Sequence, residues 1–289
     1  MHLLQVPDEV IVGVSDTAQN VPFLGLKEKP CVGKWTEPNV EKIAELKPEA
    51  VLTYGKYPSK ETRDKIESLG IKVIGIDFYY AEKYDQDLQI VAQIFSKKER
   101  AEEFLQWKNK NMSLLTERLA KVKPEEKIKV LCLWTYYFKK GIYKTFAPGS
   151  SYDQIIKLAG GINLAGELNN LPESPEVSSE WVISKDPGAI VMVYSSDILG
   201  YTTNDLQDAI RLKDEIGKNP VLGKTAAVSK GKVYFLNISG LGRFVENLYM
   251  AKWFYPQLFQ DLNPEQVLKE YFEKWVGTPY KGKWAYPEP

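Results

Sequence analysis

A helix–proline–strand pattern occurs twice in this chain and constrains its fold more than any other feature. The copies are Glu41–Leu52 and Glu180–Val191, and in each the Glu is followed by an aliphatic residue, a Pro and an Ala at the same spacings. Each Glu stands two residues after a helix-capping residue, Asn39 or Ser178, so it lies in an exposed first turn, where the helix dipole favours a carboxylate. The Pro then separates the helix from a buried strand. Two equivalent units predict two similar lobes that each present one acidic residue.

Predicted strands and helices alternate on either side of one long helix. Between Lys97 and Val122 apolar residues recur every three or four positions without Gly or Pro, which predicts a single amphipathic helix of roughly 25 residues. The predicted strands are Val10–Val14, Ala50–Tyr54, Ile71–Ile76, Ile128–Trp134, Ala189–Tyr194 and Val233–Leu236. The other predicted helices are Asn39–Leu46, Ser59–Leu69, Tyr152–Leu158, Glu180–Ser184, Leu206–Ile216, Glu246–Phe259 and Pro264–Val276.

This order predicts an α/β chain of two Rossmann-like lobes with mainly parallel sheets, joined by one long rigid α-helix. The N-terminal lobe takes residues 1–96, the linking helix residues 97–122 and the C-terminal lobe residues 123–289. The Pro- and aromatic-rich tail from Thr278 to Pro289 is either a strap or a frayed end.

The composition narrows the class of protein. Lys and Arg together number 38 and so do Asp and Glu, and this zero formal charge argues against a nucleic-acid-binding protein. The single histidine is His2, which argues against a His-rich metal centre and against a triad with an internal His. Cys31 and Cys132 have no metal-binding spacing. We therefore predict no catalytic residue and no metal ligand, and no segment approaches the ~20 apolar residues that span a bilayer.

Three stretches carry a resemblance to a known family. They are Val32–Ile43 continued by Leu46–Leu52, Ala147–Ala165 with the pattern GG-x-N-x-A, and Val221–Tyr234 with the pattern AV-x-x-G-x-V-Y. In this order they resemble the substrate-binding proteins of ABC importers for ferric siderophores, cobalamin and haem, the periplasmic binding protein class III. The resemblance covers almost the whole chain. It implies two α/β lobes bridged by one rigid helix, with the ligand in the cleft between them.

The resemblance also implies a partner and a location. In the family one exposed Glu on each lobe docks onto Arg residues of the membrane permease, and by motif position these are Glu41 and Glu180. The alternative is that both are ordinary helix-start acids. We expect a permease dimer and a small-molecule metal chelate as partners, no nucleic acid, and an extracytoplasmic location, either periplasmic or anchored on the cell surface.

The chain departs from the family at its start. Met1–Val6 resembles the end of the family's first helix. We therefore expect the N-terminal lobe to lack its first strand, and we expect a signal segment and a lipoprotein Cys to be missing from this chain. We expect contact with the membrane only through the permease or through a lipid anchor that is missing from this chain.

Ligands of open α/β sheets bind at the carboxyl ends of the strands, so we predict the ligand-binding residues from the residues at these ends. For Trp35 the alternative is a lid over the sheet, and for Arg243 it is a surface pair with Glu246. Of the adjacent Tyr136 and Tyr137, only one faces the cleft if the strand continues. The predicted ligand-binding residues are Trp35, Tyr54, Tyr57, Tyr79, Trp134, Tyr136, Tyr137, Phe146, Tyr194 and Arg243.

This set of side chains indicates a class of ligand. Aromatic faces bind the organic shell of a bulky chelate, and Arg243, which follows the Gly240–Gly242 turn, can fork onto an anionic oxygen. Lys56, Lys139 and Lys144 add positive charge. We therefore predict a solute-binding component that captures a metal chelate, with a ferric siderophore favoured and no covalently bound cofactor. The alternatives are a corrinoid- or haem-binding protein, a chelatase-like enzyme on a similar two-lobe fold, and a binding protein that signals to a sensor.

Overall fold

A computed structural model describes residues 1–238 and 243–289, which form two compact units. Unit 1 consists of Met1–Leu105 and Phe272–Pro279, and unit 2 consists of Gln106–Tyr271 and Tyr280–Pro289. Both units contain parallel strands with helices packed on them, which confirms the predicted α/β class with mainly parallel sheets. The lobe boundaries drawn from the sequence stay a prediction, and the compact units add that a short C-terminal stretch packs with the N-terminal residues.

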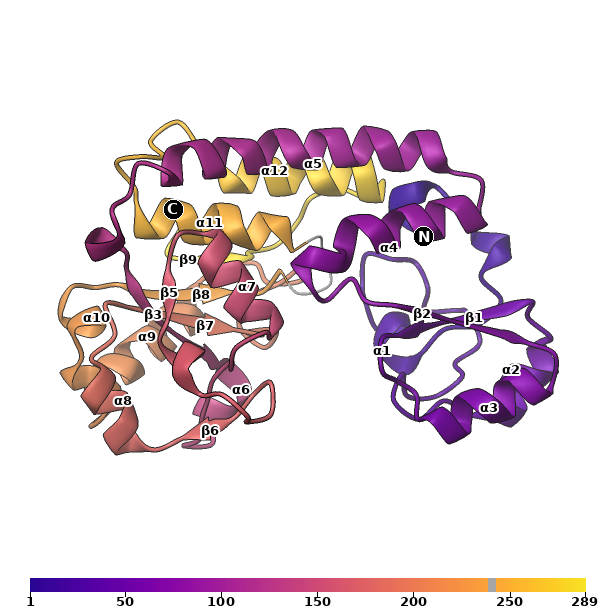
Figure 1. Ribbon diagram of the computed structural model, residues 1–289, viewed down its shortest axis with the longest axis horizontal. Coiled ribbons are helices and arrows are strands. Elements are labelled where there is room, and N and C mark those ends of the chain that lie inside the picture. Colours follow the sequence, from indigo (N-terminus) through magenta and orange to yellow (C-terminus); the bar gives the residue numbers. More distant parts are fainter. Residues whose placement is uncertain (239–242) are drawn as a thin grey trace. The chain divides into compact units, whose positions relative to one another are not determined.

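Unit 1 is built on a pair of parallel strands with helices on both faces (Figure 1). Ile43 and Ile66, from two helices, pack with Val51 and Val73 on one face of the strands, and a third helix, α4, lies on the other face. In chain order the elements are η1 (His2–Leu4), η2 (Asp8–Val10), α1 (Asp16–Gln19), α2 (Val40–Leu46), β1 (Ala50–Tyr54), α3 (Lys60–Ser68), β2 (Lys72–Ile76), α4 (Ala81–Ile94) and the start of α5 (Lys98–Leu119).

Residues from the far end of the chain complete the core of unit 1. Phe272 meets Phe23 edge to face with ring centroids 5.1 Å apart, and Trp275 meets Phe104 in the same way at 5.1 Å. The Arg100 guanidinium lies 4.2 Å from the centroid of the Trp275 ring. Phe272 and Trp275 are both fully buried, so the core of unit 1 includes residues that lie between the two segments of unit 2 in the sequence.

Unit 2 is built on a larger sheet. Its elements in chain order are the rest of α5, η3 (Pro124–Glu126), β3 (Lys129–Trp134), α6 (Thr135–Phe138), β4 (Tyr143–Lys144), α7 (Ser151–Leu158), β5 (Ile162–Asn163), η4 (Leu164–Glu167), β6 (Glu176–Val177), α8 (Ser179–Lys185), β7 (Ala189–Val193), α9 (Gln207–Lys218), η5 (Leu222–Lys224), α10 (Ala226–Ser229), β8 (Val233–Leu236), α11 (Phe244–Phe254), α12 (Pro264–Glu270), the π-helical turn η6 (Tyr271–Val276), whose residues after Tyr271 belong to unit 1, and β9 (Ala285–Tyr286).

The strand order in the main sheet of unit 2 is β5-β3-β7-β8-β9, and β9 alone in this described sheet runs antiparallel to its neighbour. Side chains alternate between its faces, so Leu131 and Ile190 join the core that contains Leu212 of α9. On the other face Tyr234 stacks on Trp253 of α11 with centroids 4.7 Å apart. Figure 1 shows α9 and α11 on opposite sides of this sheet.

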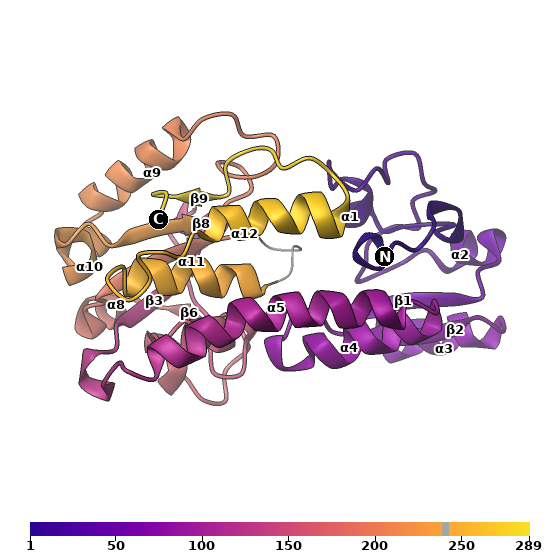
Figure 2. The same ribbon diagram turned by 90° about the horizontal axis from the view of Figure 1, so that it is seen from above.

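The long helix α5 is uninterrupted from Lys98 to Leu119, which confirms the single helix predicted between the two β/α halves (Figures 1 and 2). Its residues up to Leu105 belong to unit 1, and those from Gln106 onward belong to unit 2.

Some sequence predictions were wrong or incomplete. Val10–Val14 is not a strand: η2 ends at Val10, and only Val14 forms a bridge, with Cys31. Val10 and Val12 are exposed and Val14 is buried, so the segment is covered only at the residue that forms the bridge. The helix α4 was not predicted. The tail is a strap, because β9 pairs with β8.

Both glycines of the GG-x-N-x-A motif have a packing reason. Gly160 has φ +82°, and a Cβ atom there would lie 2.7 Å from Leu119 Cδ2. A Cβ atom on Gly161 would lie 2.9 Å from Val130 Cγ2 and 3.1 Å from Phe254 Cε2. The ends of α5, α7 and α11 therefore approach β3 closely only because these two positions lack side chains.

Gly160→Ala should lower the free energy of unfolding by about 2–4 kcal/mol, because left-handed backbone strain costs about 1–2 kcal/mol and overpacking a further 1–3 kcal/mol. Gly141 is a matched control, since its φ is +77° and nothing lies within 4 Å of a Cβ atom there. Gly141→Ala should cost only the strain, about 1–2 kcal/mol. Urea unfolding measures both variants, and equal costs would contradict the packing argument.

Candidate functional site

An aromatic cluster lies at the carboxyl ends of β3 and β7 in unit 2. Trp134, the last residue of β3, stacks on Tyr194, which directly follows β7, with ring centroids 4.1 Å apart and 24° between the planes. Trp134 also contacts Phe146 at 5.5 Å and Tyr137 at 5.9 Å. Because β3 and β7 are parallel neighbours, their carboxyl ends meet at one edge of the sheet. We call Trp134, Tyr137, Phe146 and Tyr194 the C-terminal aromatic cluster.

Polar contacts fix both stacked rings. Tyr194 has φ +53°, in the left-handed region that bulky residues rarely adopt, and its hydroxyl oxygen accepts a hydrogen bond of 3.2 Å from Arg243. The Trp134 Nε1–H donates to Ser174 Oγ over 3.0 Å. A strained backbone held by its surroundings at a strand end is typical of a functional position.

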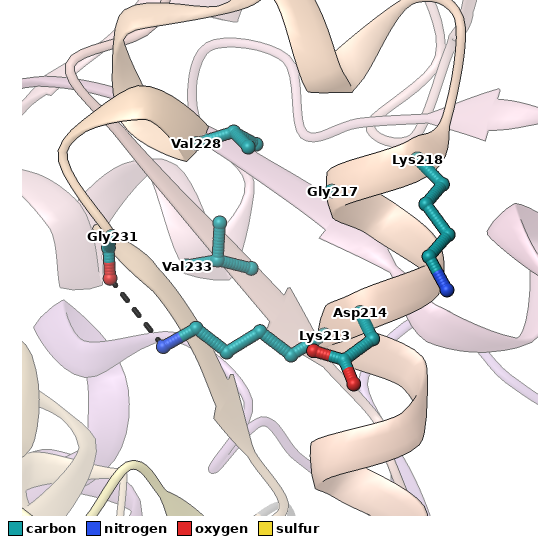
Figure 3. A pocket seen from close by; sticks show the side chains of 7 residues that line it. All are labelled: Lys213, Asp214, Gly217, Lys218, Val228, Gly231 and Val233. Carbon is teal, nitrogen blue, oxygen red and sulfur yellow. Dashed lines mark hydrogen bonds between the residues drawn. The ribbon is translucent and has the colours of Figure 1, made fainter.

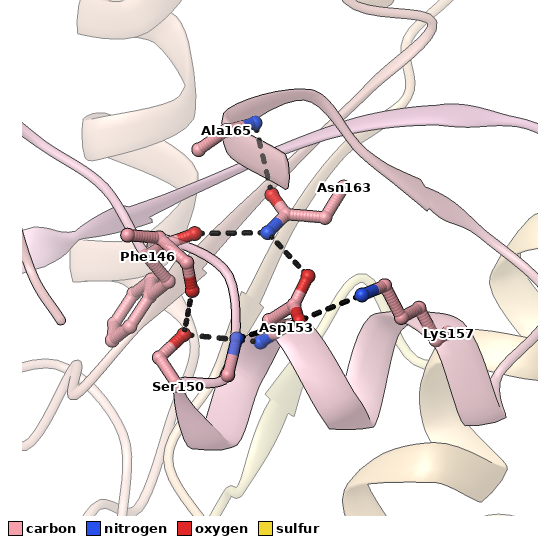
Figure 4. A network of polar contacts seen from close by, with 8 residues as sticks. Phe146, Ser150, Asp153, Lys157, Asn163 and Ala165 are labelled. Atoms are coloured by element: carbon pink, nitrogen blue, oxygen red, sulfur yellow. Dashed lines mark hydrogen bonds and ion pairs between the residues drawn. The ribbon is translucent and has the colours of Figure 1, made fainter. Parts of the chain in front are cut away.

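Phe146 supports Trp134 from within the protein. It is fully buried, and its backbone carbonyl accepts a hydrogen bond of 2.8 Å from Asn163 Nδ2 (Figure 4). The same Asn163 amide donates to Asp153 Oδ1 at 2.9 Å, and its Oδ1 accepts from the Ala165 N–H at 3.1 Å. Phe146 therefore offers no surface to a ligand in this structure, and its role as a ligand-binding residue stays a prediction.

The Asp153 carboxylate completes this buried network (Figure 4). Its Oδ2 accepts from the Gly149 N–H at 3.0 Å and from Lys157 Nζ at 2.8 Å. Ser150 Oγ donates to the Ala147 carbonyl at 2.7 Å and accepts from the Asp153 N–H at 3.3 Å. The network ties the loop that carries Phe146 to α7 and β5, which gives the Asn of the GG-x-N-x-A motif a positioning role.

A buried ion pair lies beside the C-terminal aromatic cluster. Arg243 is 7% exposed and Glu246 is fully buried, with 3.5 Å between NH1 and Oε2. Tyr152 donates to Glu246 Oε1 at 3.1 Å. Burial raises the pKa of Glu246, and the Arg243 charge and these hydrogen bonds oppose that rise. The sequence alternative of a surface pair was thus right about the partner and wrong about its burial. The Gly240–Gly242 turn lies outside the described residues.

Tyr136 and Tyr137 lie in α6 and not in a continued strand, because β3 ends at Trp134. The expectation that only one of them faces the ligand assumed a continued strand, so it no longer applies. Tyr136 is 55% exposed, with Lys140 Nζ 4.0 Å from its ring centroid, and Lys144 Nζ lies 4.3 Å from the centroid of Tyr137. The exposed border of the cluster thus combines aromatic rings with ammonium groups.

A second aromatic cluster lies at the carboxyl end of β1 in unit 1. Trp35 meets Tyr54 at 5.3 Å and Tyr57 at 5.0 Å, edge to face in both contacts, and Tyr54 also meets Tyr79 at 6.0 Å. Trp35 is 42% exposed. We call these four residues the N-terminal aromatic cluster. Every predicted ligand-binding residue of unit 1 belongs to it, and each assignment stays a prediction.

Glu41 and Glu180 take the positions that the repeated pattern predicted. Each is exposed in the first turn of its helix, α2 or α8. The caps are Asn39, which accepts from the Lys42 N–H at 2.9 Å, and Ser178, which accepts from the Trp181 N–H at 3.2 Å. Hydrogen bonds from its own backbone N–H and from Ser178 lower the pKa of Glu180. Docking by either residue stays a prediction.

A cavity of about 410 Å³ lies at the opposite end of the unit 2 sheet, by the first residue of β8 (Figure 3). The Lys213 ammonium group donates to the Gly231 carbonyl at 3.4 Å across it. None of the predicted ligand-binding residues lines this cavity. Its lining residues are Lys213, Asp214, Gly217, Lys218, Val228, Gly231 and Val233.

Within residues 1–238 and 243–289 no cluster of His, Cys, Asp and Glu is arranged to hold a metal ion. In the same part of the chain no helix has both the length and the apolar character needed to cross a membrane. Cys31 and Cys132 are free thiols, and burial raises the pKa of Cys132 well above its usual value.

Sequence reasoning missed the supporting residues of the unit 2 site. Tyr152 and Asn163 were seen only as parts of a helix and a motif, although Asn in a glycine-rich motif is a signal for a side chain that bonds to the backbone. Ser174 carries no sequence signal, because it reaches Trp134 only through the folding of a long loop.

The chain resembles known proteins in sequence. A sequence model of the family described as periplasmic binding protein matches residues 3–238. The molybdate-binding protein MolA of Haemophilus influenzae is 23% identical over 274 residues, which cover 84% of this chain and 71% of MolA. The vitamin B12-binding protein of Yersinia pestis is 24% identical over 163 residues, 56% of this chain and 54% of that protein. The chain thus spans about half the length of this second relative.

Solved structures show the same fold. A TroA-like periplasmic binding protein FepB from Veillonella parvula superimposes with a TM-score of 0.77 at 22% identity, covering 95% of this chain and 85% of that one. MolA bound to molybdate gives a TM-score of 0.72 at 19% identity with the same coverage of both chains. At these identities the likeness to solved structures establishes the fold alone.

Asn163→Leu should lower the free energy of unfolding by about 2–4 kcal/mol, because the buried Asp153 carboxylate and the Phe146 carbonyl lose their amide donor. Asn169 is the control: it is exposed, and its amide donates only to the nearby Glu167 carbonyl, at 3.2 Å. Asn169→Leu should change stability by no more than about 0.5 kcal/mol. Urea unfolding of both variants measures the difference, and similar costs would refute the positioning role of Asn163.

Proposed function

Because the chain belongs to the periplasmic binding protein family, whose members are binding proteins and not enzymes, we propose that it captures a metal-containing ligand outside the cytoplasm and delivers it to the permease of an ABC importer. The observation that carries this proposal is the pair of aromatic clusters, each at the carboxyl end of parallel strands in its own unit.

The favoured ligand is a bulky metal chelate, with a ferric siderophore first. Exposed rings such as Trp35 and Tyr136 offer flat faces to an organic shell. Lys140 and Lys144 lie against tyrosine rings of the C-terminal aromatic cluster and its border, where they can balance the negative charge of a chelate. This combination suits a large anionic ligand better than a bare cation, for which carboxylate or imidazole ligands are the usual choice.

Molybdate is the second candidate. The relative MolA is named a molybdate-binding protein. In this chain the Arg243 guanidinium and the Tyr194 hydroxyl lie 3.2 Å apart at a strand end, and both are groups that can donate to an oxyanion. Arg243 is already paired with Glu246, however, which favours the larger chelate as the first candidate.

Trp35→Ala should weaken binding of the cognate ligand about tenfold to a hundredfold, since an aromatic stacking contact contributes roughly 1–3 kcal/mol. The probes are a ferric catecholate, a ferric hydroxamate, cyanocobalamin, haemin and molybdate, each titrated into the protein with tryptophan fluorescence and calorimetry as readouts. Trp181→Ala is the control, because this partly buried ring of α8 donates to Glu167 of η4 and belongs to neither aromatic cluster. Absence of binding to every probe would contradict the proposed function.

Glu41→Ala combined with Glu180→Ala should leave ligand affinity unchanged and abolish uptake, since both carboxylates would dock onto the permease. The control pair Glu45→Ala with Glu176→Ala removes the same charge from exposed positions of unit 1 and unit 2. Uptake in cells that express the cognate permease is the measurement. Full uptake by the double variant of Glu41 and Glu180 would contradict the proposal that these residues dock onto the permease.

A further inference from the structure

A chain of polar contacts leads from the interior of unit 2 to the ring that stacks on Trp134. Tyr152 on α7 donates to Glu246 on α11 at 3.1 Å, and Glu246 accepts from Arg243 at 3.5 Å. Arg243 in turn donates to the Tyr194 hydroxyl oxygen at 3.2 Å. The proposed function uses the rings at the end of this chain of contacts and leaves Glu246 without a role.

Burial makes the charge of Glu246 necessary. An Arg guanidinium stays protonated in proteins, and at 7% exposure Arg243 needs a nearby counter-charge. Glu246 is fully buried and lies within ion-pair distance of this cation. The pair is therefore electroneutral as a whole, although it contains a cation next to the predicted ligand-binding surface.

The same contacts restrict where the guanidinium can point. One of its nitrogens is directed to Glu246 and another to Tyr194, and its carbon lies 5.2 Å from the centroid of the Tyr152 ring. The lysines at the border differ from it: Lys140 lies against Tyr136 at an exposed position, and Lys144 lies against Tyr137, where both residues are half-buried. Unit 2 thus has one buried cation that is paired with a carboxylate and two lysines that are less buried.

We propose that Glu246 is a positioning residue that holds Arg243 against Tyr194 and cancels its charge. The surface made by Trp134 and Tyr194 then recognises its ligand by ring contact, and the recognition of negative charge falls to the lysines at the border. The claim about ligand recognition rests on the proposed function. The claim that Glu246 positions Arg243 does not, because it concerns only the contacts among Tyr152, Glu246 and Arg243.

The first test needs no ligand. Phenylglyoxal modifies accessible arginines, and peptide mass spectrometry follows each one. In the unaltered protein Arg243 should react about tenfold more slowly than the exposed Arg211, because reaction requires local opening. Glu246→Gln keeps the shape and removes the charge, so modification of Arg243 should accelerate several-fold while Arg211 stays unchanged. Equal rates for both arginines in the unaltered protein, or no acceleration in the variant, would overturn the proposal.

Two further variants keep this test decisive. Glu265→Gln is the matched control, since Glu265 also accepts from a tyrosine hydroxyl, that of Tyr280 at 3.2 Å, and Tyr280 belongs to neither aromatic cluster. It should leave the Arg243 rate unchanged. If thermal unfolding shows that Glu246→Gln does not fold, Glu246→Asp takes its place, because it keeps the charge while shortening the reach to Arg243.

The second test measures charge preference by calorimetry. Glu246→Gln should bind an anionic probe, molybdate or a ferric tris-dihydroxybenzoate complex, about tenfold more tightly than the unaltered protein, because the Arg243 charge is no longer compensated. Binding of the neutral probe cyanocobalamin should not change. Unchanged or weaker anion binding would refute the charge-balancing role. If the unaltered protein binds no probe, the proposed function fails and the arginine reactivity still decides this proposal.

Discussion

Parallel pairing of β3 with β7, and of β7 with β8, is the constraint from which the rest of unit 2 follows. These strands are buried on both faces, so they can be covered only by helices, and each parallel connection must return through a helix on one side or the other. The consequence is that all carboxyl ends meet at one edge. Trp134 and Tyr194 come together there because Trp134 pairs with Val193, the residue before Tyr194, in the register of β3 and β7.

Around that edge the supporting contacts are local and specific. The Asn163 amide and the Asp153 carboxylate satisfy one another and the loop before α7. Gly160 and Gly161 let that helix pack closely on its neighbours. The family motif GG-x-N-x-A is therefore a packing and hydrogen-bonding device whose effect reaches Trp134 through the buried ring of Phe146.

Much of this arrangement could be predicted from the sequence. Strand ends, helix caps and the long helix α5 follow from periodicity and from residues such as Asn39 and Ser178, whose side chains act on their immediate neighbours. The burial of the Arg243 side chain could not be predicted, because it depends on helices that are distant in sequence. The short α6 after Trp134 was missed for a related reason: its tyrosines have strand-like propensity, and tertiary packing overrides it.

The interleaved connectivity of unit 1 has a consequence for the order in which the chain can fold during synthesis. Its first 105 residues lack the buried rings of Phe272 and Trp275 until synthesis has passed residue 275. Domains usually fold from the N-terminus onward as they emerge. Here the first segment of unit 1 must wait for Phe272–Pro279 to complete its core, whereas β3, β7 and β8 of unit 2 are synthesised before those residues. Unit 1 is thus the natural candidate for the slower step in reaching the native state.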